Sequence, residues 1–337
     1  METQKKILVT GGAGYLGSIL CRKLIAKGYW VICVDPCLHG EKPIADLLQN
    51  SSFFLLKKDL RNIADVSRLL DGCYAIIHLA ALVGDVACNL NESETVQINY
   101  LCTMALAEAA LLYKVERFLF AGTTSVYGSG KNILYEGSHT NPLSIYAKTK
   151  LQCEHALLKI SSINPTILRT ATVYGLSPRM RFDLVVNVMV AKAVKNGKIE
   201  VYGGEQWRPF IHVDDITEVY ILILEAPLWR VSSQIFNVVS ENHTISEVAQ
   251  IIAKQYPNTK IEAHPTSIDK RDYCVSNDKL ITTLQFKPRN TILEEVPKIG
   301  AWLLENNVDI SSAIYSNEKT LRKTYQELLI EGETDKI

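Results

Sequence analysis

Apolar residues along this chain form short runs that alternate with longer amphipathic segments. The runs are rich in Val, Ile, Leu and Phe and end at glycine or polar residues, which is typical of buried strands in a parallel sheet. They predict strands at residues 6–10, 30–34, 53–57, 75–79, 117–121 and 166–170. The segments between them place apolar residues at helical spacing and predict helices at residues 16–27, 95–113 and 144–160.

This alternation predicts an α/β fold with a doubly wound parallel sheet that carries helices on both faces. Beyond Tyr174 the pattern changes to glycine, proline and arginine, followed by a helix at residues 184–196 and short strand-like pieces. We expect residues 1–174 to form the first domain, to which residues 208–239 return. Residues 175–207 and 240–305 should form a smaller C-terminal α/β lobe over the carboxyl ends of the strands. Residues 306–337 form a charged tail, either an extra helix or partly disordered.

Composition narrows the classes of partner. The chain has 337 residues with 36 basic and 36 acidic side chains, so no net charge directs it to nucleic acid or to an anionic membrane. Its N-terminus enters a strand without a signal-peptide core, and no apolar run approaches the roughly 20 residues that span a bilayer. Of the eight cysteines, Cys33 and Cys37 are four apart, but no second pair follows to complete a zinc site. We therefore expect a soluble, cytoplasmic protein with reduced cysteines and no metal.

A glycine-rich turn joins the first predicted strand to the first helix. Its sequence, Thr-Gly-Gly-Ala-Gly-Tyr-Leu-Gly, places glycines at positions 11, 14 and 17. Glycines at this spacing let the backbone approach a pyrophosphate, and the following helix presents free N–H groups to it. The turn therefore predicts a Rossmann dinucleotide site that includes Gly11, Gly14, Tyr15, Leu16 and Gly17.

A carboxylate at the end of the second strand indicates which dinucleotide is bound. Asp35 lies 24 positions after Gly11, where it can accept the adenosine ribose hydroxyls. It would repel a 2′-phosphate, and residues 36–38 contain no Arg to hold one, so NAD is favoured over NADP. Asp59 and Leu60, after the third strand, are candidates for adenine contacts; alternatively, Asp59 caps a solvated loop.

A tyrosine and a lysine open the helix that follows Pro142. Tyr146 and Lys150 are four positions apart and share one helical face. A phenol has a pKa of about 10 and is a poor base at neutral pH, but a nearby ammonium lowers that pKa. Proton abstraction from a hydroxyl then becomes feasible. This spacing occurs by chance on many helices, and the preceding dinucleotide loop is what makes it specific.

With these motifs, the chain resembles the extended short-chain dehydrogenases, the group that contains nucleotide-sugar epimerases, dehydratases and decarboxylases. The resemblance covers roughly residues 5–300 and includes His78-Leu-Ala-Ala81, Asn99, Thr123-Thr-Ser-Val-Tyr-Gly128 and Arg208-Pro-Phe-Ile-His-Val-Asp214. It implies a nucleotide-diphosphate sugar as substrate. It also implies a homodimer or higher homo-oligomer formed through the helices at 95–113 and 144–160. Leu101, Ala105, Ala109 and Leu112 would then face either the partner or the sheet.

The resemblance also implies roles for individual residues. Tyr146 is the base, Lys150 binds the nicotinamide ribose and tunes Tyr146, and Thr123 hydrogen-bonds the reacting sugar oxygen. Further cofactor contacts are expected from Leu79, Ala80, Ala81 and Asn99, although a structural role for Asn99 is equally consistent. Substrate contacts are expected from Thr124, Asn187, Arg208 and Arg271, with the Arg208 fork on the diphosphate. Pro209 departs from the family's usual Asp. We expect structural roles for His212 and His78.

The reaction is constrained by the residues after Thr123. The family's 4,6-dehydratases commonly carry acidic residues there, and the decarboxylases a Glu, whereas this chain has Thr124 and Ser125. Neither hydroxyl replaces a carboxylic acid, so elimination of water is disfavoured. We therefore expect oxidation at C4 by a 4-epimerase, or alternatively by a 4-dehydrogenase that releases the keto sugar. A non-sugar reductase and an NAD-binding sensor are further alternatives, but a sensor would be expected to lose the Tyr146 and Lys150 pair.

Overall fold

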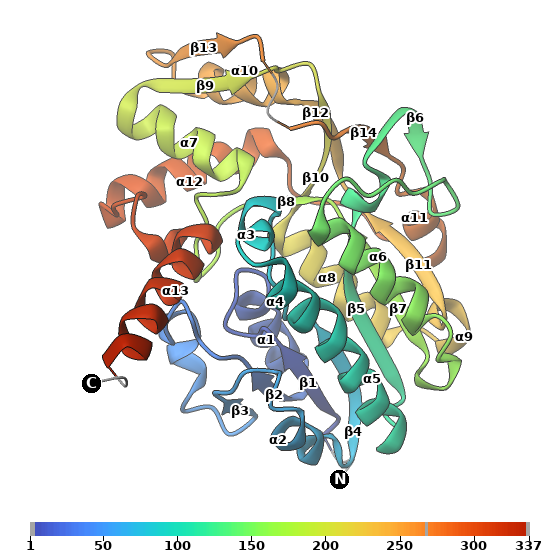
Figure 1. Ribbon diagram of the computed structural model, residues 1–337. Coiled ribbons are helices and arrows are strands. Elements are labelled where there is room, and N and C mark those ends of the chain that lie inside the picture. Colours follow the sequence, from blue (N-terminus) through green and yellow to red (C-terminus); the bar gives the residue numbers. More distant parts are fainter. Residues whose placement is uncertain (1–3, 267–268, 335–337) are drawn as a thin grey trace.

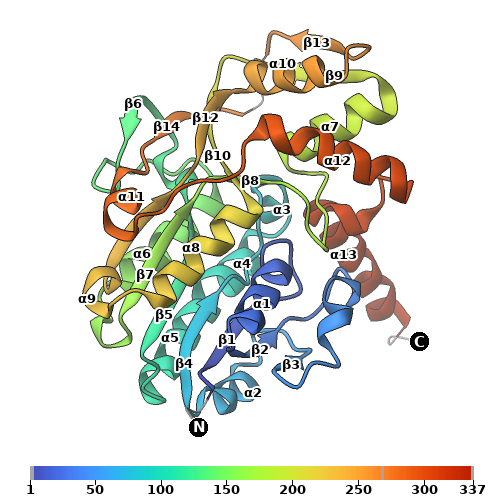
Figure 2. The same ribbon diagram turned by 180° about the vertical axis from the view of Figure 1, so that it is seen from behind.

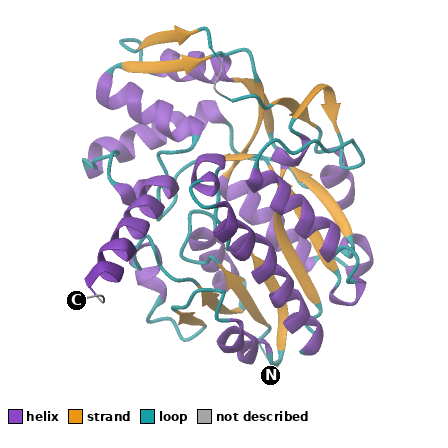
Figure 3. Cartoon of the chain, viewed as in Figure 1, coloured by secondary structure: helices purple, strands orange, loops and turns teal. Residues whose placement is uncertain are grey.

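Seven parallel strands form one sheet in the order β11-β7-β5-β4-β1-β2-β3 in the computed structural model, which describes residues 4–266 and 269–334 (Figures 1 and 3). The strand order reverses between β1 and β4, and at such a point the loops at the carboxyl ends part to form a crevice. The strands are β1 (Lys6–Thr10), β2 (Trp30–Val34), β3 (Phe53–Leu56), β4 (Cys73–His78), β5 (Arg117–Thr123), β7 (Pro165–Thr170) and β11 (Gln234–Val238).

Helices cover both faces of this sheet and bury its apolar side chains. One face packs against α1 (Gly17–Ala26) and α8 (Val213–Glu225), and the other against α2 (Ile63–Ser67), α5 (Cys102–Leu112) and α6 (Ile145–Leu157). The predicted doubly wound sheet is thus confirmed. Strand β11 comes from the segment that was expected to return to the first domain.

A second lobe lies over the carboxyl ends of the strands (Figures 1 and 2). Its core lies between α7 (Val185–Asn196), α10 (Ile245–Gln255), α12 (Ile292–Asn306) and the pair β9 (Lys198–Tyr202) and β13 (Lys260–His264). A small sheet of β8 (Thr172–Tyr174), β10 (Trp207–His212) and β12 (Glu241–Thr244) connects the lobes. The remaining longer elements include α3 (Asp85–Asn89), β6 (Ser129–Leu134), β14 (Asp272–Val275), α11 (Asp278–Leu284) and α13 (Asn317–Thr334).

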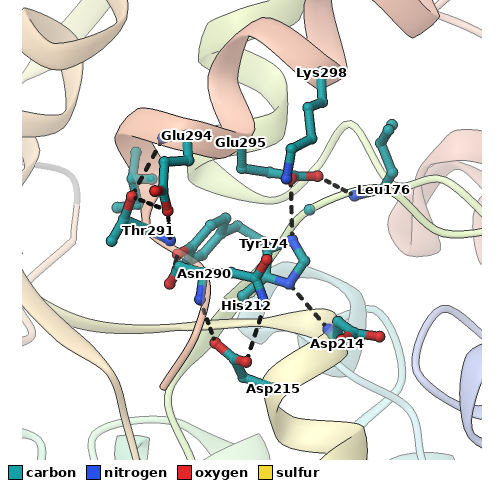
Figure 4. Close-up of polar contacts among 12 residues, drawn as sticks. Tyr174, Leu176, His212, Asp214, Asp215, Asn290, Thr291, Glu294, Glu295 and Lys298 are labelled. Carbon is teal, nitrogen blue, oxygen red and sulfur yellow. Dashed lines mark hydrogen bonds and ion pairs between the residues drawn. The ribbon is translucent and has the colours of Figure 1, made fainter. Parts of the chain in front are cut away.

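His212 joins the two lobes at the start of α8 (Figure 4). Its Nδ1 accepts a hydrogen bond of 3.1 Å from the Asp214 backbone N–H, and its Nε2 lies 3.3 Å from the Glu295 carboxylate on α12. The ring packs edge-on against Tyr174, and a Cβ at Gly175 would come within 2.5 Å of it. Gly175, at φ +114°, is therefore required here. These contacts give His212 a structural role between the lobes.

The helical segment Glu92–Leu112 comprises α4 (Glu92–Val96), the π turn η3 (Gln97–Leu101) and α5. Its 21 residues are long and apolar enough to cross a membrane by length and composition, so the expectation that no segment approaches that limit was wrong. Leu106, Ala107 and Ala110 are nevertheless fully buried against the sheet. In this structure the segment is therefore a core helix that packs against the sheet.

Association of two chains through α5 and α6 stays a prediction. Leu101, the last residue of η3, is 54% exposed and Leu112, the last residue of α5, is 76% exposed, whereas Ala109 is buried toward the sheet. We expect Leu112→Glu to shift a dimer toward monomer in light scattering at micromolar concentration, because two charges would be desolvated at the interface. Leu304→Glu, on the 71% exposed Leu304 of α12, is the matched control. A wild-type protein that is monomeric at this concentration would contradict the prediction.

Candidate active site

A cavity of about 710 Å³ opens between the carboxyl ends of the sheet and the second lobe. Its position is the switch point of the sheet, where doubly wound folds bind their ligands. The cavity is lined by most of the residues that the sequence predicted: Gly11, Gly14, Tyr15, Leu16, Gly17, Asp35, Asp59, Leu60, Leu79, Ala80, Ala81, Thr123, Thr124, Tyr146, Lys150, Arg208 and Arg271.

The glycine-rich turn leaves no room for side chains on the sheet side of the cavity. Gly11 has φ +74°, and a Cβ there would lie 2.9 Å from the Ala80 backbone nitrogen. A Cβ at Gly17 would collide with the Gly11 carbonyl. Only glycine therefore fits at positions 11 and 17. The turn built this way leaves the start of α1 open to the cavity. That arrangement fits a pyrophosphate.

Asp35 directly follows β2, and two backbone N–H groups hold its carboxylate. Oδ2 accepts a 3.0 Å hydrogen bond from the Ala13 backbone N–H, and Oδ1 accepts one of 2.7 Å from Cys37. Burial raises the pKa of the Asp35 carboxyl, and these two bonds oppose that rise. Each oxygen keeps a lone pair, and Asp35 lines the cavity, as ribose recognition requires.

Cofactor preference tests this role of Asp35. The double substitution Asp35→Ala and Pro36→Arg removes a repulsive charge and supplies a phosphate partner, so the Kd for NADP should fall by about tenfold or more. The Kd for NAD should rise, because its ribose loses an acceptor. Fluorescence titration of both dinucleotides measures the change, with Leu48→Ala, at an exposed position outside the cavity lining, as control. Tighter binding of NADP than NAD by the wild type would refute this role.

Arg179 lines the cavity, and sequence reasoning noted it only as part of a turn. Its side chain is 5% exposed, and its Nη2 lies 2.9 Å from His39 Nε2 and donates a 2.8 Å bond to Asn317 Oδ1. Its Nε has no hydrogen-bond partner among the described residues. Burial lowers the pKa of this guanidinium to about 9. A buried cation with a free N–H beside the glycine-rich turn fits the dinucleotide phosphates.

The three predicted catalytic residues meet at the end of β5. Ser144 caps α6 by accepting a 3.2 Å bond from the Ala147 N–H, which starts the helix one residue before Tyr146. Tyr146 and Lys150 then face the cavity together with Thr123 from the end of β5. Burial raises the pKa of the Tyr146 phenol, and a hydrogen bond with Thr123 lowers it.

The expected influence of Lys150 on Tyr146 stays a prediction. Lys150 Nζ donates a 2.9 Å bond to the Ala121 carbonyl and lies over the Phe120 ring, so its charge is directed toward β5. Burial lowers the pKa of Lys150 to about 8. The positive charge of Arg181, which also lines the cavity, lowers the pKa of Tyr146.

Arg208 and Arg271, which the sequence predicts to contact the substrate, both contact the carboxylate of Asp269. Arg208 Nη2 lies 3.0 Å from Asp269, and Arg271 Nε donates to Asp269 at 2.9 Å. Arg271 Nη1 also donates a 3.1 Å bond to Ser125 Oγ, next to the catalytic residues. These arginines hold the pKa of Asp269 well below its usual range. The sequence predicted both arginines but not the shared Asp269.

Two predicted contact residues lie outside the cavity lining. Asn187 is fully buried in α7, where Oδ1 accepts from the Gly175 N–H at 3.1 Å and Nδ2 donates to Tyr15 Oη at 3.2 Å. Asn187 therefore ties the second lobe to the glycine-rich turn and is not placed on a diphosphate. Asn99 holds the loop after β4, because its amide pairs with both the N–H and the carbonyl of Leu82, at 2.7 and 3.0 Å.

His78 and the cysteines take no part in the cavity. His78 is buried between the hydroxyls of Thr10 and Thr103, at 2.7 and 2.8 Å, and burial lowers its pKa to about 3. All eight cysteines are free. Within residues 4–266 and 269–334, no cluster of three His, Cys, Asp or Glu side chains could hold a metal ion.

Comparison with known proteins identifies the family. The NAD dependent epimerase/dehydratase family matches residues 7–239. The uncharacterized UDP-glucose epimerase YtcB of Bacillus subtilis (strain 168) is 33% identical over 66% of this chain and 73% of its own length. UDP-glucuronic acid decarboxylase 1 of Arabidopsis thaliana is 30% identical over 87% of this chain and 68% of its own.

Solved structures agree with this family. UDP-glucuronic acid 4-epimerase from Bacillus cereus, in complex with UDP-glucuronic acid and NAD, is 27% identical and has a TM-score of 0.78. The match covers 89% of this chain and 99% of that one. The dinucleotide cradle, the Tyr146 and Lys150 pair and these matches lead to one conclusion. The chain belongs to the NAD-dependent epimerase/dehydratase family of nucleotide-sugar enzymes and uses NAD.

Proposed function

We propose that this enzyme interconverts the C4 epimers of a nucleotide-diphosphate sugar. One observation carries the proposal: Thr123, Tyr146 and Lys150 open into the same cavity as the cofactor cradle and the Arg208–Arg271 pair. A sugar linked to a diphosphate on these arginines would reach the catalytic hydroxyls from the second lobe. Relatives named as epimerases of UDP-sugars support this substrate class, and UDP-glucose and UDP-glucuronic acid are the first candidates.

The residues of the chain divide the chemistry among them. NAD, when bound, accepts a hydride from the substrate carbon and returns it. Thr123 orients the reacting hydroxyl, and Tyr146 Oη takes its proton and gives it back in the second half of the cycle. The Tyr146 pKa, raised by burial, must fall for this step, and the positive charge of Arg181 acts in that direction. Lys150 is held against β5 by the hydrogen bond that it donates to the Ala121 carbonyl.

The groups beside Thr123 support epimerisation over elimination. Thr124 Oγ1 lies 3.2 Å from Tyr273 Oη, and Ser125 Oγ accepts from Arg271, so neither group is a free acid or base. Asp85 is a cavity carboxylate that the sequence did not single out. It accepts a 2.6 Å bond from Ser144 Oγ and lies 3.5 Å from Arg271, so both of its oxygens already have partners.

Product analysis tests the proposal. The enzyme is incubated with UDP-glucose, UDP-glucuronic acid and the corresponding GDP-, dTDP- and CDP-sugars, and the products are followed by NMR, with Tyr146→Phe as the inactive control. We expect a mixture of C4 epimers without net formation of NADH. A keto sugar with stoichiometric NADH would instead support the alternative, a 4-dehydrogenase. A 6-deoxy-4-keto product would overturn the proposal and would direct attention to Asp85.

A further inference from the structure

The C-terminal helix α13 lies against the cofactor half of the molecule rather than extending as a tail. It follows α12 of the second lobe and descends beside α3 and the segment after β2 (Figures 1 and 2). Leu321 on α13 is 7% exposed and packs with Leu82, Ala87 and Cys88 of the loop after β4 and of α3. Further along, Tyr325 donates a hydrogen bond to Glu94. The helix is therefore anchored over its first half, as far as Tyr325.

Asn317, the first residue of α13, lines the cavity and forms hydrogen bonds to two loops that also line it. Its Oδ1 accepts a 2.8 Å bond from Arg179, and its backbone N–H donates a 2.9 Å bond to Asp183, both in the segment after β8. Its Nδ2 donates a 3.2 Å bond to the Val83 carbonyl in the loop after β4. One asparagine thus bridges two loops that lie about 100 positions apart in sequence and that both line the cavity.

A second contact from α13 holds the other partner of Arg179. Thr320 Oγ1 donates to the Ala313 carbonyl at 2.7 Å, so it accepts from His39 Nδ1 at 3.2 Å. Burial and the Arg179 charge lower the pKa of His39 to about 3, so the ring is neutral near pH 7. His39 and Asn317 together fix the Arg179 guanidinium, whose buried Nε remains without a partner among the described residues.

We propose that α13 is a strap across the cofactor cleft and that Asn317 is the positioning residue that aims Arg179 at the NAD phosphates. Bound NAD would then leave only after α13 detaches from the loop after β4. Slow release suits an enzyme that regenerates its cofactor within each turnover, because exchange with free NAD is not needed. The inference rests on the NAD site and not on the identity of the sugar.

The dissociation rate of NAD, measured without any sugar, tests the strap. Full-length protein loaded with radiolabelled NAD is chased with unlabelled NAD, and retained label is followed by rapid filtration. Asn317→Ala should release NAD about ten- to hundredfold faster, the effect of losing hydrogen bonds that orient a charged group. Asn317→Asp keeps the acceptor for Arg179 but loses the Nδ2 donor to the Val83 carbonyl, so it should restore the retention only in part. Arg322→Ala, on the exposed side of α13, is the matched control and should match the wild type.

A variant remote from the cavity separates a strap from a local contact. Tyr325→Phe removes the hydrogen bond to Glu94 without touching the cavity lining, and a strap predicts faster NAD release from this variant too. Thermal unfolding of the NAD-free proteins shows whether a variant has lost stability instead. If Asn317→Ala is unstable, Tyr325→Phe decides. Wild-type dissociation rates in stable Asn317→Ala or Tyr325→Phe protein would overturn the strap. The proposed C4 epimerisation would still stand after that result.

Discussion

Replacing Tyr146 with Phe should lower kcat by about 10²–10⁴-fold and leave the Kd for NAD nearly unchanged. The substitution removes only the phenolic oxygen, while the ring keeps its packing in the cluster of Leu82, Cys88 and Leu321. Thr123 alone cannot accept the proton, because an alkyl hydroxyl is a far weaker base than a phenolate. Turnover of the sugar identified by NMR and titration with NAD measure the two effects.

Two further variants control this experiment. Tyr135→Phe makes the same chemical change at a tyrosine that is 51% exposed and outside the cavity lining, and it should retain wild-type kcat. Lys150→Ala should impair both turnover and NAD binding, because Lys150 lines the cofactor cavity and is bound to β5. If Tyr146→Phe kept more than about a tenth of the wild-type kcat, general-base catalysis by Tyr146 would be ruled out.

Glu154→Ala should destabilise the fold by about 3–5 kcal/mol. Tyr146, Lys150 and Glu154 are spaced by four along α6, so the catalytic residues and this carboxylate lie on one stripe of the helix. Glu154 pairs with Arg169 of β7, and the two side chains are 1% and 4% exposed. Its loss would leave Arg169 as a buried charge without its carboxylate. Urea unfolding measures the free energy of unfolding.

The matched control for this prediction is an exposed ion pair. Glu225 is 43% exposed and lies 3.0 Å from Lys27, which is 46% exposed, so Glu225→Ala should change the free energy of unfolding by less than about 1 kcal/mol. The double substitution Glu154→Leu and Arg169→Met should recover part of the loss, because it removes both charges. A loss below about 1 kcal/mol in Glu154→Ala would mean that the buried pair does not anchor α6 to the sheet.

The sequence by itself determined the sheet and the cofactor loop. Buried strands such as β4 and β5 are encoded by continuous apolar runs, and the glycine-rich turn by residues that follow one another in the chain. The pairing of Tyr146 with Lys150 is equally local, since helical periodicity alone brings positions four apart to one face. In each case the physical requirement acts over a few residues, and a linear pattern can express it.

Only the tertiary structure decided how the rest of the cavity is built. Asn317 contacts Arg179, 138 positions away in sequence, and Arg271 contacts Ser125, 146 positions away. No spacing rule predicts contacts between residues so far apart in the chain. The side chain of Asn187 does not line the cavity, because the packing of the second lobe places it against Tyr15. The charges around Tyr146 likewise depend on which long side chains the fold brings near it. Electrostatic and hydrogen-bond partners are set by proximity in space, which the chain reaches only after its hydrophobic core has packed.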